Sequence, residues 1–398
     1  MPALLFVTPM TPGRASGGAL ASLAVLRALR GRGWDLHLVQ NSNAPPSEEV
    51  AALCREVTIV HRPDRVTAPL GTGLSRLLRC GYWPKYQREV RETVERLLLK
   101  GGYDLLLLDH LLSVEYGRFA REAGFALPIV LRAHNVESQL EARGLPHLRS
   151  PRLVAESLAR LRRLRAIESS LARYCDLALA ISALDARQLG AWNPGLPVEV
   201  LPSPADTDHF RPGPKVPAGK EIVFIGGMNW RPNAHGICWF VEEVLWRVFS
   251  RHPEAHLTVI GDSPPDRLRS RPGVSALGFV PDERAIMARA RVVIVPIRFG
   301  SGVRIKILNS LTMGKAVVST GVGAEGIPVQ DGESILIADD GPAFAEAVCR
   351  LLEDDALVAR LARNGPRLCL EQHGPLPFAE RLDALLRGVL RRAASPAA

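Results

Sequence analysis

Apolar residues along the chain follow two spacings, and the two alternate from one end to the other. Short apolar runs typical of buried strands are separated by stretches in which apolar residues recur every three or four positions, as in an amphipathic helix. Residues 3–8, 35–40 and 56–60 are runs of the first kind, and residues 19–30 are a stretch of the second. This order predicts an α/β fold with doubly wound sheets.

The alternation continues to the carboxyl end of the chain. Further strands are predicted at 103–108, 128–132, 176–181, 197–201, 221–225, 256–260, 274–279, 291–295 and 334–338. Further helices are predicted at 84–100, 112–123, 151–175, 281–289, 302–313, 342–353 and 376–392, with a long one that ends near residue 250.

A proline-rich stretch, residues 202–219, divides the two series of elements. Because 398 residues exceed one typical core and prolines stiffen a connector, we interpret this stretch as a linker. The domains are then residues 1–201 and 220–375, facing each other across a cleft. The last predicted helix, 376–392, either packs back on the first domain or ends as a basic surface helix.

Polar and glycine residues follow several predicted strands at the edge where open α/β sheets bind ligands. Gly17 and Gly18 come after the first strand and before its helix, where a ligand site and a simple turn are both open interpretations. His134 follows strand 128–132, so it is either a ligand contact or a satisfied polar residue. Asp109-His110 stands at the same position one strand earlier and is a weaker candidate.

Residues 296–326 concentrate glycine and positive charge around a predicted helix. Arg298, Arg304 and Lys306 lie in the loop and in the first turn of helix 302–313, and Arg231 begins the long helix of the same domain. Cations near a helix N-terminus are unfavourable unless an anion binds there or their side chains reach solvent. With backbone N–H groups nearby, this pattern predicts a site for a phosphate or diphosphate.

Several other motifs resemble known ligand or metal sites but lack a feature that such sites need. The GxGxxG pattern of 321–326 follows a strand, but residues 327–332 are turn material, so we expect no following helix and no dinucleotide cradle. Residues 313–316 lack the glycine and hydroxyl of a Walker motif. The DxD at 206–208 resembles a metal site, but in a proline-rich connector it favours a turn. The cysteines lack metal spacing and are interpreted as reduced thiols, at positions 54, 80, 175, 238, 349 and 369.

The formal net charge of +9 permits nucleic acid, an anionic membrane or phosphate-bearing ligands as partners. Helix 151–175 is amphipathic and rich in arginine, which indicates either a solvated face or contact with anionic head groups. The apolar start lacks a basic region and a cleavage site, and no apolar run is long enough to cross a bilayer. We therefore expect a cytoplasmic protein. Peripheral contact with the inner face of the plasma membrane stays an open alternative.

Six segments in the same order resemble retaining glycosyltransferases of the GT-B fold, family four, and most closely the branch of bacterial exopolysaccharide and cell-surface glycan clusters. The resemblance covers nearly the whole chain. The segments are TPMTPGRASGG, RAHNVES, CDLALAISALDARQL, FIGGMNWRPNAHGICWFVEEVLW, LGFVPD and VPIRFGSGVRIKILNSLTMGKAVVSTGVGAEGI.

The resemblance implies a UDP- or GDP-sugar donor on the second domain and a glycan, lipid-linked or small-molecule acceptor on the first. It also implies retention of anomeric configuration, with no metal, no cofactor and no nucleic-acid partner. His134, Arg304 and Lys306 would be catalytic, with His134 at the donor sugar and the two cations at the diphosphate. The implied donor-binding set is Gly17, Gly18, Gly227, Arg231, Arg298, Gly302, Asn309 and Glu325.

The sequence departs from the family pattern at two places beside the expected cleft. Asn309 stands where the family has a glutamate for the nucleotide ribose, and Ser301 replaces the paired acid. Residues 203–206 read SPAD in place of Asn-Gly-Val-Asp. An amide cannot make the charge-assisted bond of a carboxylate. A nucleotide-sugar epimerase of the same fold and a catalytically inactive binding protein therefore stay as alternatives.

Overall fold

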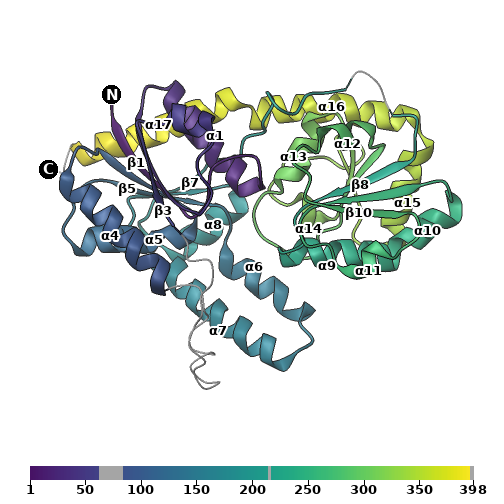
Figure 1. Ribbon diagram of the computed structural model, residues 1–398, viewed down its shortest axis with the longest axis horizontal. Coiled ribbons are helices and arrows are strands. Elements are labelled where there is room, and N and C mark those ends of the chain that lie inside the picture. Colours follow the sequence, from purple (N-terminus) through teal and green to yellow (C-terminus); the bar gives the residue numbers. More distant parts are fainter. Residues whose placement is uncertain (62–83, 214–216, 395–398) are drawn as a thin grey trace. The chain divides into compact units, whose positions relative to one another are not determined.

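The computed structural model describes residues 1–61, 84–213 and 217–394. They divide into two compact units, Met1–Ser203 with the segment that begins at Leu376, and Pro204–Pro375. Each unit is a parallel sheet with helices on both faces (Figure 1), which confirms the predicted α/β class. Cys80 and positions 214–216 of the predicted linker lie outside the described residues.

The sheet of the first unit has seven parallel strands in the order β3-β2-β1-β4-β5-β6-β7. Their bounds are β1 (Ala3–Thr8), β2 (Asp35–Asn41), β3 (Glu56–Val60), β4 (Leu105–Asp109), β5 (Ile129–Ala133), β6 (Leu177–Ala180) and β7 (Val198–Val200). The helices are α1 (Gly17–Gly31), α2 (Glu48–Leu53), α4 (Pro84–Lys100), α5 (Val114–Glu122), α6 (Glu137–Gly144), α7 (Pro151–Glu168), α8 (Ala183–Trp192) and α17 (Pro375–Ala394).

Strand register in this sheet brings particular strand ends together. Asp109, the last residue of β4, pairs with Arg132 of β5, and Val7 near the end of β1 pairs with Leu108 of β4. Because all strands are parallel, the loops that follow them leave from one edge. Side chains from the ends of β1, β4 and β5 therefore meet at that edge.

Two apolar clusters cover the two faces of the first sheet. One combines strand residues with α1 and α17, and the other combines them with α4, α5 and α8, as Figure 1 also shows. Helix α17 contributes Leu382 and Leu386, both fully buried. Its Asp383 accepts a hydrogen bond from the Trp34 indole at 2.7 Å. The last helix is thus part of the core of the first unit.

The sheet of the second unit has six parallel strands in the order β10-β9-β8-β11-β12-β13. Their bounds are β8 (Glu221–Ile225), β9 (His256–Ile260), β10 (Val274–Gly278), β11 (Val292–Val295), β12 (Ala316–Ser319) and β13 (Leu336–Ile337). The helices are α9 (Arg231–Trp239), α10 (Leu245–Arg251), α11 (Asp266–Arg269), α12 (Arg284–Arg289), α13 (Ile305–Thr312), α14 (Gly321–Ala324), α15 (Gly341–Glu353) and α16 (Asp355–His373).

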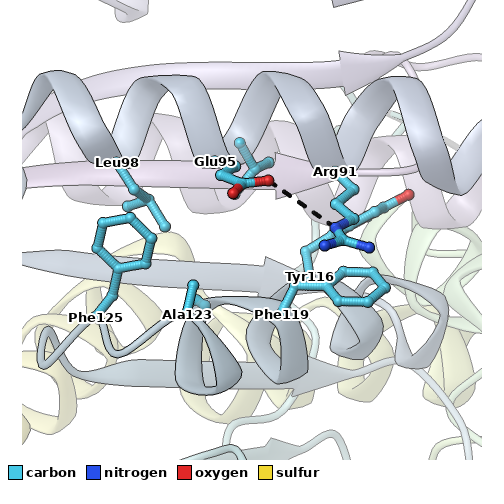
Figure 2. Close-up of a pocket in the computed structure, with 9 residues that line it drawn as sticks. Arg91, Glu95, Leu98, Tyr116, Phe119, Ala123 and Phe125 are labelled. Atoms are coloured by element: carbon cyan, nitrogen blue, oxygen red, sulfur yellow. Dashed lines mark ion pairs between the residues drawn. The ribbon is translucent and has the colours of Figure 1, made fainter.

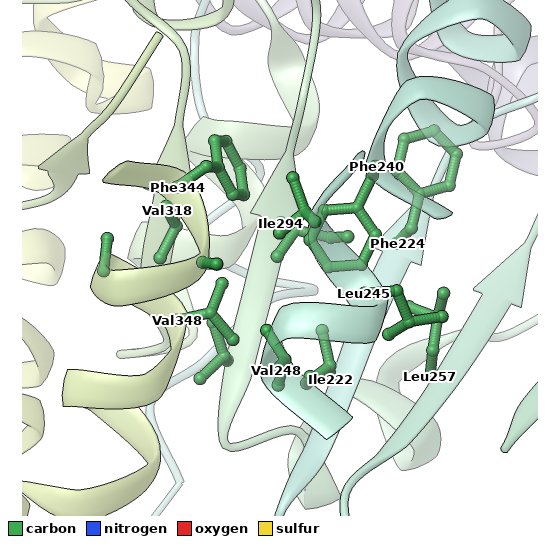
Figure 3. Packing of buried hydrophobic residues seen from close by; sticks show 14 of the residues in the cluster. Ile222, Phe224, Phe240, Leu245, Val248, Leu257, Ile294, Val318, Phe344 and Val348 are labelled. Atoms are coloured by element: carbon green, nitrogen blue, oxygen red, sulfur yellow. The ribbon is translucent and has the colours of Figure 1, made fainter. Parts of the chain in front are cut away.

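The larger core of this unit packs strand residues against α9, α10 and α15. Figure 3 shows the part of it in which residues of α10 and α15 meet the strands. Phe344 of α15 packs edge-to-face against Phe240, with ring centroids 5.8 Å apart. Gly236 of α9 approaches the backbone of Pro296 so closely that a Cβ would lie 3.0 Å from the Pro296 carbonyl carbon. The helix that starts after β8 is therefore held directly against the loop that follows β11.

Several helices differ from the sequence prediction. Helix α7 ends at Glu168, and a separate 3₁₀ turn, Leu171–Arg173, follows it. Helices α12 and α13 begin at Arg284 and Ile305, each three residues later than predicted. Helices α2, α6 and α16 were not predicted. Pro366 lies inside α16, where proline removes a hydrogen bond, but close packing of Gly365 on Leu311 accompanies the continued helix.

Candidate functional site

In the second unit, Lys306 lies against the glycine turn that follows β8. Its ammonium donates to Asn233 Oδ1 at 2.7 Å, and the Asn233 amide donates to the Gly227 carbonyl at 2.9 Å. A Cβ at Gly226 would collide with this ammonium and would lie 2.5 Å from Asn233 Nδ2. The absence of a side chain at Gly226 therefore leaves room for the lysine to meet Asn233.

The charge of Lys306 is poorly compensated. In the part of the chain that the structure describes, Lys306 forms no ion pair with a carboxylate, and its polar contact is the neutral amide of Asn233. Burial, followed by the charge of Arg304, lowers the pKa of Lys306 to about 7. Cations crowded together in this way are costly and leave a positive potential suited to an anion.

Arg304 occupies the residue just before α13 and is 4% exposed. Its guanidinium donates to the carbonyls of Ser301 and, at 2.7 Å, Gly302, and it lies over the Trp230 ring at 5.4 Å. Gly302 has a φ of +79°, a conformation that favours glycine. The loop after β11 is thus folded around this one cation.

Two further predicted arginines flank the same loop. Arg298 lies over the ring of Trp239, 4.7 Å from its centroid, and Arg231, exposed at the start of α9, lies 5.9 Å from the centroid of Phe299. Strands β8 and β11 are neighbours in the sheet. Their following loops therefore bring Gly227, Arg231, Arg298, Gly302, Arg304 and Lys306 to one edge.

The other two residues predicted for this site, Asn309 and Glu325, lie further along the chain, in α13 and just after α14. Asn309 lies in α13, and its Oδ1 is buried without a hydrogen-bond partner among the described residues. Glu325 is the residue just after the short helix α14, which follows β12. Neither residue is linked to Lys306 by the hydrogen bonds described above.

No helix follows the GxGxxG segment, as expected from residues 327–332. The first residues of the segment itself form α14, a single turn that the sequence did not predict. The amide of Gly321 is taken by Asp339 Oδ1 at 2.8 Å, and that of Gly323 by Thr320 Oγ1 at 2.9 Å. Because a carboxylate already occupies the start of this turn, it offers no cradle to a diphosphate.

In the first unit, α1 begins at Gly17, with Ser16 as its N-cap. A Cβ at Gly18 would meet Met10 and would lie 3.7 Å from His110 Nε2. Gly18 therefore stands close to His110, which follows β4 in the chain. The start of α1 and the end of β4 form one neighbourhood.

His134 is the centre of a buried polar network in the same neighbourhood. Its Nε2 lies 2.8 Å from Asp109 Oδ1 and 2.8 Å from Arg132 Nη1, and Arg132 Nη1 donates to the same Asp109 oxygen at 2.8 Å. Burial lowers the pKa of His134, and Arg132 lowers it further against the opposite effect of Asp109. Burial alone would raise the pKa of Asp109, but His134 and Arg132 hold it below its usual range.

His110 is a weaker candidate from its sequence position, yet its conformation and contacts in the structure make it a strong one. Its φ of 73° and ψ of 145° lie near a region that only glycine occupies readily. Its ring stacks on that of His134 with centroids 3.9 Å apart. Burial and His134 lower the pKa of His110 to about 3. Backbone strain of this kind is typical of functional positions, and the sequence carries no direct signal for it.

The predicted turn at the DxD is seen: Asp206 accepts from the backbone N–H of His209 at 3.3 Å. Across the described ranges, no group of three or more His, Cys, Asp or Glu side chains is placed to hold a metal ion. None of the helices in those ranges combines the length and apolar character needed to cross a membrane.

One pocket lies away from both glycine edges (Figure 2). Its walls are α4 and α5, and it contains the Arg91–Glu95 ion pair at 4.0 Å. The Arg91 guanidinium lies over the Phe119 ring at 4.0 Å. These helices run back along the sheet from its carboxyl edge, so the pocket belongs to the helical layer and not to the strand ends.

Two models of glycosyltransferase families match the chain. A family model described as Glycosyltransferase Family 4 matches residues 15–209, and one described as Glycosyl transferases group 1 matches residues 219–354. The two matches fall on either side of the proline-rich stretch and together cover most of the chain.

Curated relatives are similar over part of their length. A stretch of 154 residues is 26% identical to an uncharacterized 44.6 kDa protein in the cps region of Klebsiella pneumoniae, covering 36% of this chain and 40% of that protein. A stretch of 182 residues is 26% identical to the phosphatidyl-myo-inositol mannosyltransferase of Mycobacterium tuberculosis, covering 42% and 47%. The chain thus spans less than half of the length of these relatives.

Solved structures show the same fold over the whole chain. Sucrose-phosphate synthase from Thermosynechococcus elongatus superposes with a TM-score of 0.77 at 18% identity, covering 99% of this chain and 100% of that one. HepE from Anabaena, in complex with UDP and glucose, superposes with a TM-score of 0.72 at 15% identity, covering 98% and 100%. The chain therefore belongs to glycosyltransferase family four and has the GT-B fold of two parallel-sheet α/β domains.

Proposed function

We propose that this glycosyltransferase transfers a sugar from a UDP- or GDP-sugar to a glycan, lipid-linked or small-molecule acceptor. We further propose that it does so with retention of anomeric configuration and without a metal or other cofactor. The single observation that carries the proposal is the half-buried ammonium of Lys306, which has no carboxylate partner among the described residues and lies beside Arg304.

The two cations fit the needs of a diphosphate leaving group. Negative charge grows on the diphosphate as its bond to the sugar breaks, and fixed positive groups in a dry site stabilise that charge most at the transition state. Arg304 is already held by two carbonyls, and Lys306 by Asn233, so little reorganisation is needed. The complex of HepE with UDP and glucose supports a nucleotide-sugar as donor.

Asn309 supports a place for the nucleotide within this unit. Its Oδ1 is buried and accepts no hydrogen bond from the described residues, so it is a ready acceptor for a ligand hydroxyl. We assign it to the ribose, as the family pattern implies. Glu325 lies at the end of the neighbouring α14 and is assigned to the sugar or the nucleotide.

The chemical step that we propose needs no protein nucleophile. The bond between the anomeric carbon and the diphosphate oxygen breaks, and its electron pair stays on the diphosphate. The acceptor hydroxyl attacks the same face of the sugar, and its proton passes to the departing phosphate oxygen. In this scheme His134 contacts the donor sugar, Gly17 and Gly18 face the donor phosphate or the acceptor, and Arg304 and Lys306 hold the diphosphate.

A donor panel tests the proposal directly. The protein is incubated with UDP- and GDP-sugars and a mixture of glycan and lipid-linked acceptors, and release of the nucleoside diphosphate is followed with and without EDTA. We expect release with at least one donor, unaffected by EDTA, and an anomeric coupling in the product equal to that of the donor. An inverted product would contradict retention, and loss of activity in EDTA would contradict metal independence.

A further inference from the structure

Three polar atoms meet in the first unit with nearly equal separations. Asp109 Oδ1, Arg132 Nη1 and His134 Nε2 lie 2.8 Å from one another, and all three side chains are at most 9% exposed. The three come from the ends of adjacent strands, because Asp109 of β4 pairs in register with Arg132 of β5. The arrangement is therefore set by the sheet and not by a mobile loop.

We propose that Arg132 is a positioning residue for His134: it offsets the pull of the Asp109 carboxylate, so that the buried imidazole stays neutral and Nδ1 is the nitrogen offered to the ligand. The role that His134 then plays toward a sugar rests on the proposed function. Its neutral state does not, and it can be measured without any substrate.

The bonding of Arg132 points to this role. Nη1 makes both of its contacts, to Asp109 and His134, while Nε and Nη2 are buried without a hydrogen-bond partner among the described residues. Leaving guanidinium N–H groups unsatisfied in the interior is unfavourable. An arginine kept at that cost, with its contacts directed to one carboxylate and one imidazole, is explained by what it does to them.

The charges around His134 oppose each other. A carboxylate beside a histidine favours the imidazolium, and a guanidinium beside it favours the neutral ring. Burial has the largest effect and lowers the pKa of His134, Asp109 opposes it by favouring a proton on the ring, and Arg132 acts against Asp109. Asp109 is held from its other side by the hydroxyls of Ser22 of α1 and Thr8 of β1, so its position does not depend on the histidine.

Two more titratable groups face this network. His110, which follows β4, stacks on His134, and Glu137 of α6 acts on His110 through its charge. The stack fixes the plane of the His134 ring, and Nε2 is engaged by Asp109 and Arg132. Both constraints leave the opposite ring nitrogen, Nδ1, as the atom available to a ligand.

Titration of the histidine ring by NMR tests the proposal on the intact protein. The ten histidines are labelled at Cε1, and the His134 signal is assigned as the one missing from His134→Gln. We expect this signal not to move between about pH 6 and 8 in the unaltered protein. In Arg132→Met its midpoint should rise by about one pH unit or more, and in Arg132→Lys, which keeps the charge, it should stay low.

Removing Arg132 alone leaves a buried carboxylate unpaired, and that variant is prone to unfold. The double variant Arg132→Met/Asp109→Asn removes both charges, and in it we expect the midpoint to stay low because the opposing carboxylate is gone. The proposal is overturned if His134 titrates near pH 6.5 in the unaltered protein, or if the double variant raises its midpoint. Either result stands whether or not the chain transfers sugar.

Discussion

The Lys306 ammonium and the Asn233 amide are joined by a hydrogen bond of 2.7 Å, although the two residues belong to different helices that follow different strands. The same amide donates a hydrogen bond to the Gly227 carbonyl through its nitrogen. The glycine turn after β8 and the cationic helix after β11 are thereby one structure. Several expected outcomes depend on this link.

Substituting Gly226 should disturb the cation directly. In Gly226→Ala the new Cβ collides with the Lys306 ammonium and with Asn233 Nδ2, so the lysine must move away from the turn. We expect nucleoside-diphosphate affinity, measured by calorimetry, to fall about tenfold or more. The matched control is Gly332→Ala, where φ is +75° and a Cβ meets no atom within 4 Å. It should cost about 1–2 kcal/mol of stability and leave the affinity unchanged.

Nucleotide affinity should depend on pH through Lys306. Because the pKa of Lys306 is lowered to about 7, the free protein loses this charge as the pH rises above that value, while a bound diphosphate favours the charged form. We expect affinity to fall by up to about tenfold per pH unit above pH 7, and Lys306→Met to remove the dependence.

Lys315, which is buried, supplies the control for that titration. Burial lowers the pKa of Lys315 to about 8, but its ammonium donates to the carbonyls of Ala288 and Ala290 at the opposite edge of the sheet, where β12 begins. Lys315→Met should keep the pH dependence of binding. If it removes that dependence as fully as Lys306→Met does, the dependence does not report on the proposed site.

The strain at His110 predicts an order of stabilities. A φ of 73° with ψ of 145° suits glycine, so His110→Gly should be more stable than His110→Ala by about 1–3 kcal/mol. Both variants lose the ring stacked on His134, so we expect both to transfer sugar poorly. Chemical denaturation gives the stabilities. Equal stabilities would show that position 110 is relaxed in solution.

Helix α7 predicts contact with anionic membranes. Arg162 and Arg163 are exposed on it, with Leu153 and Leu158 exposed nearby at 48% and 39%. We expect the protein to float with vesicles that contain phosphatidylglycerol and less with neutral ones, and Arg162→Glu/Arg163→Glu to lose this binding. The control with the same charge change is Arg363→Glu/Arg367→Glu, on exposed positions of α16. Equal flotation with anionic and neutral vesicles would contradict the predicted contact with anionic membranes.

Much of the fold follows from local patterns in the sequence. The bounds of β1, β8 and β9 agree with the apolar runs that predicted them, because the middle residues of such parallel strands are buried on both faces of the sheet. The bounds of the edge strand β3 agree as well. Helix α16 was missed because a Gly-Pro pair ordinarily ends a helix, and packing on α13 outweighed that local preference. The late start of α13 reflects Arg304, whose side chain folds back onto two loop carbonyls.

The site was predicted as separate residues and not as connected groups. The sequence places Asp109 and Arg132 at two strand ends, but only the strand register pairs them. Asn233 had no role in the sequence argument, because nothing local shows that it meets Lys306. The conformation of His110 depends on its tertiary surroundings and leaves no trace in composition or spacing.

Calorimetric titration with UDP and GDP tests the central claim most directly, because the claim is that Arg304 and Lys306 form a diphosphate site. We predict that at least one of the two nucleotides binds near neutral pH, that Lys306→Met weakens this binding about tenfold or more, and that Lys315→Met does not. Failure of the unaltered, folded protein to bind either nucleotide would contradict the account.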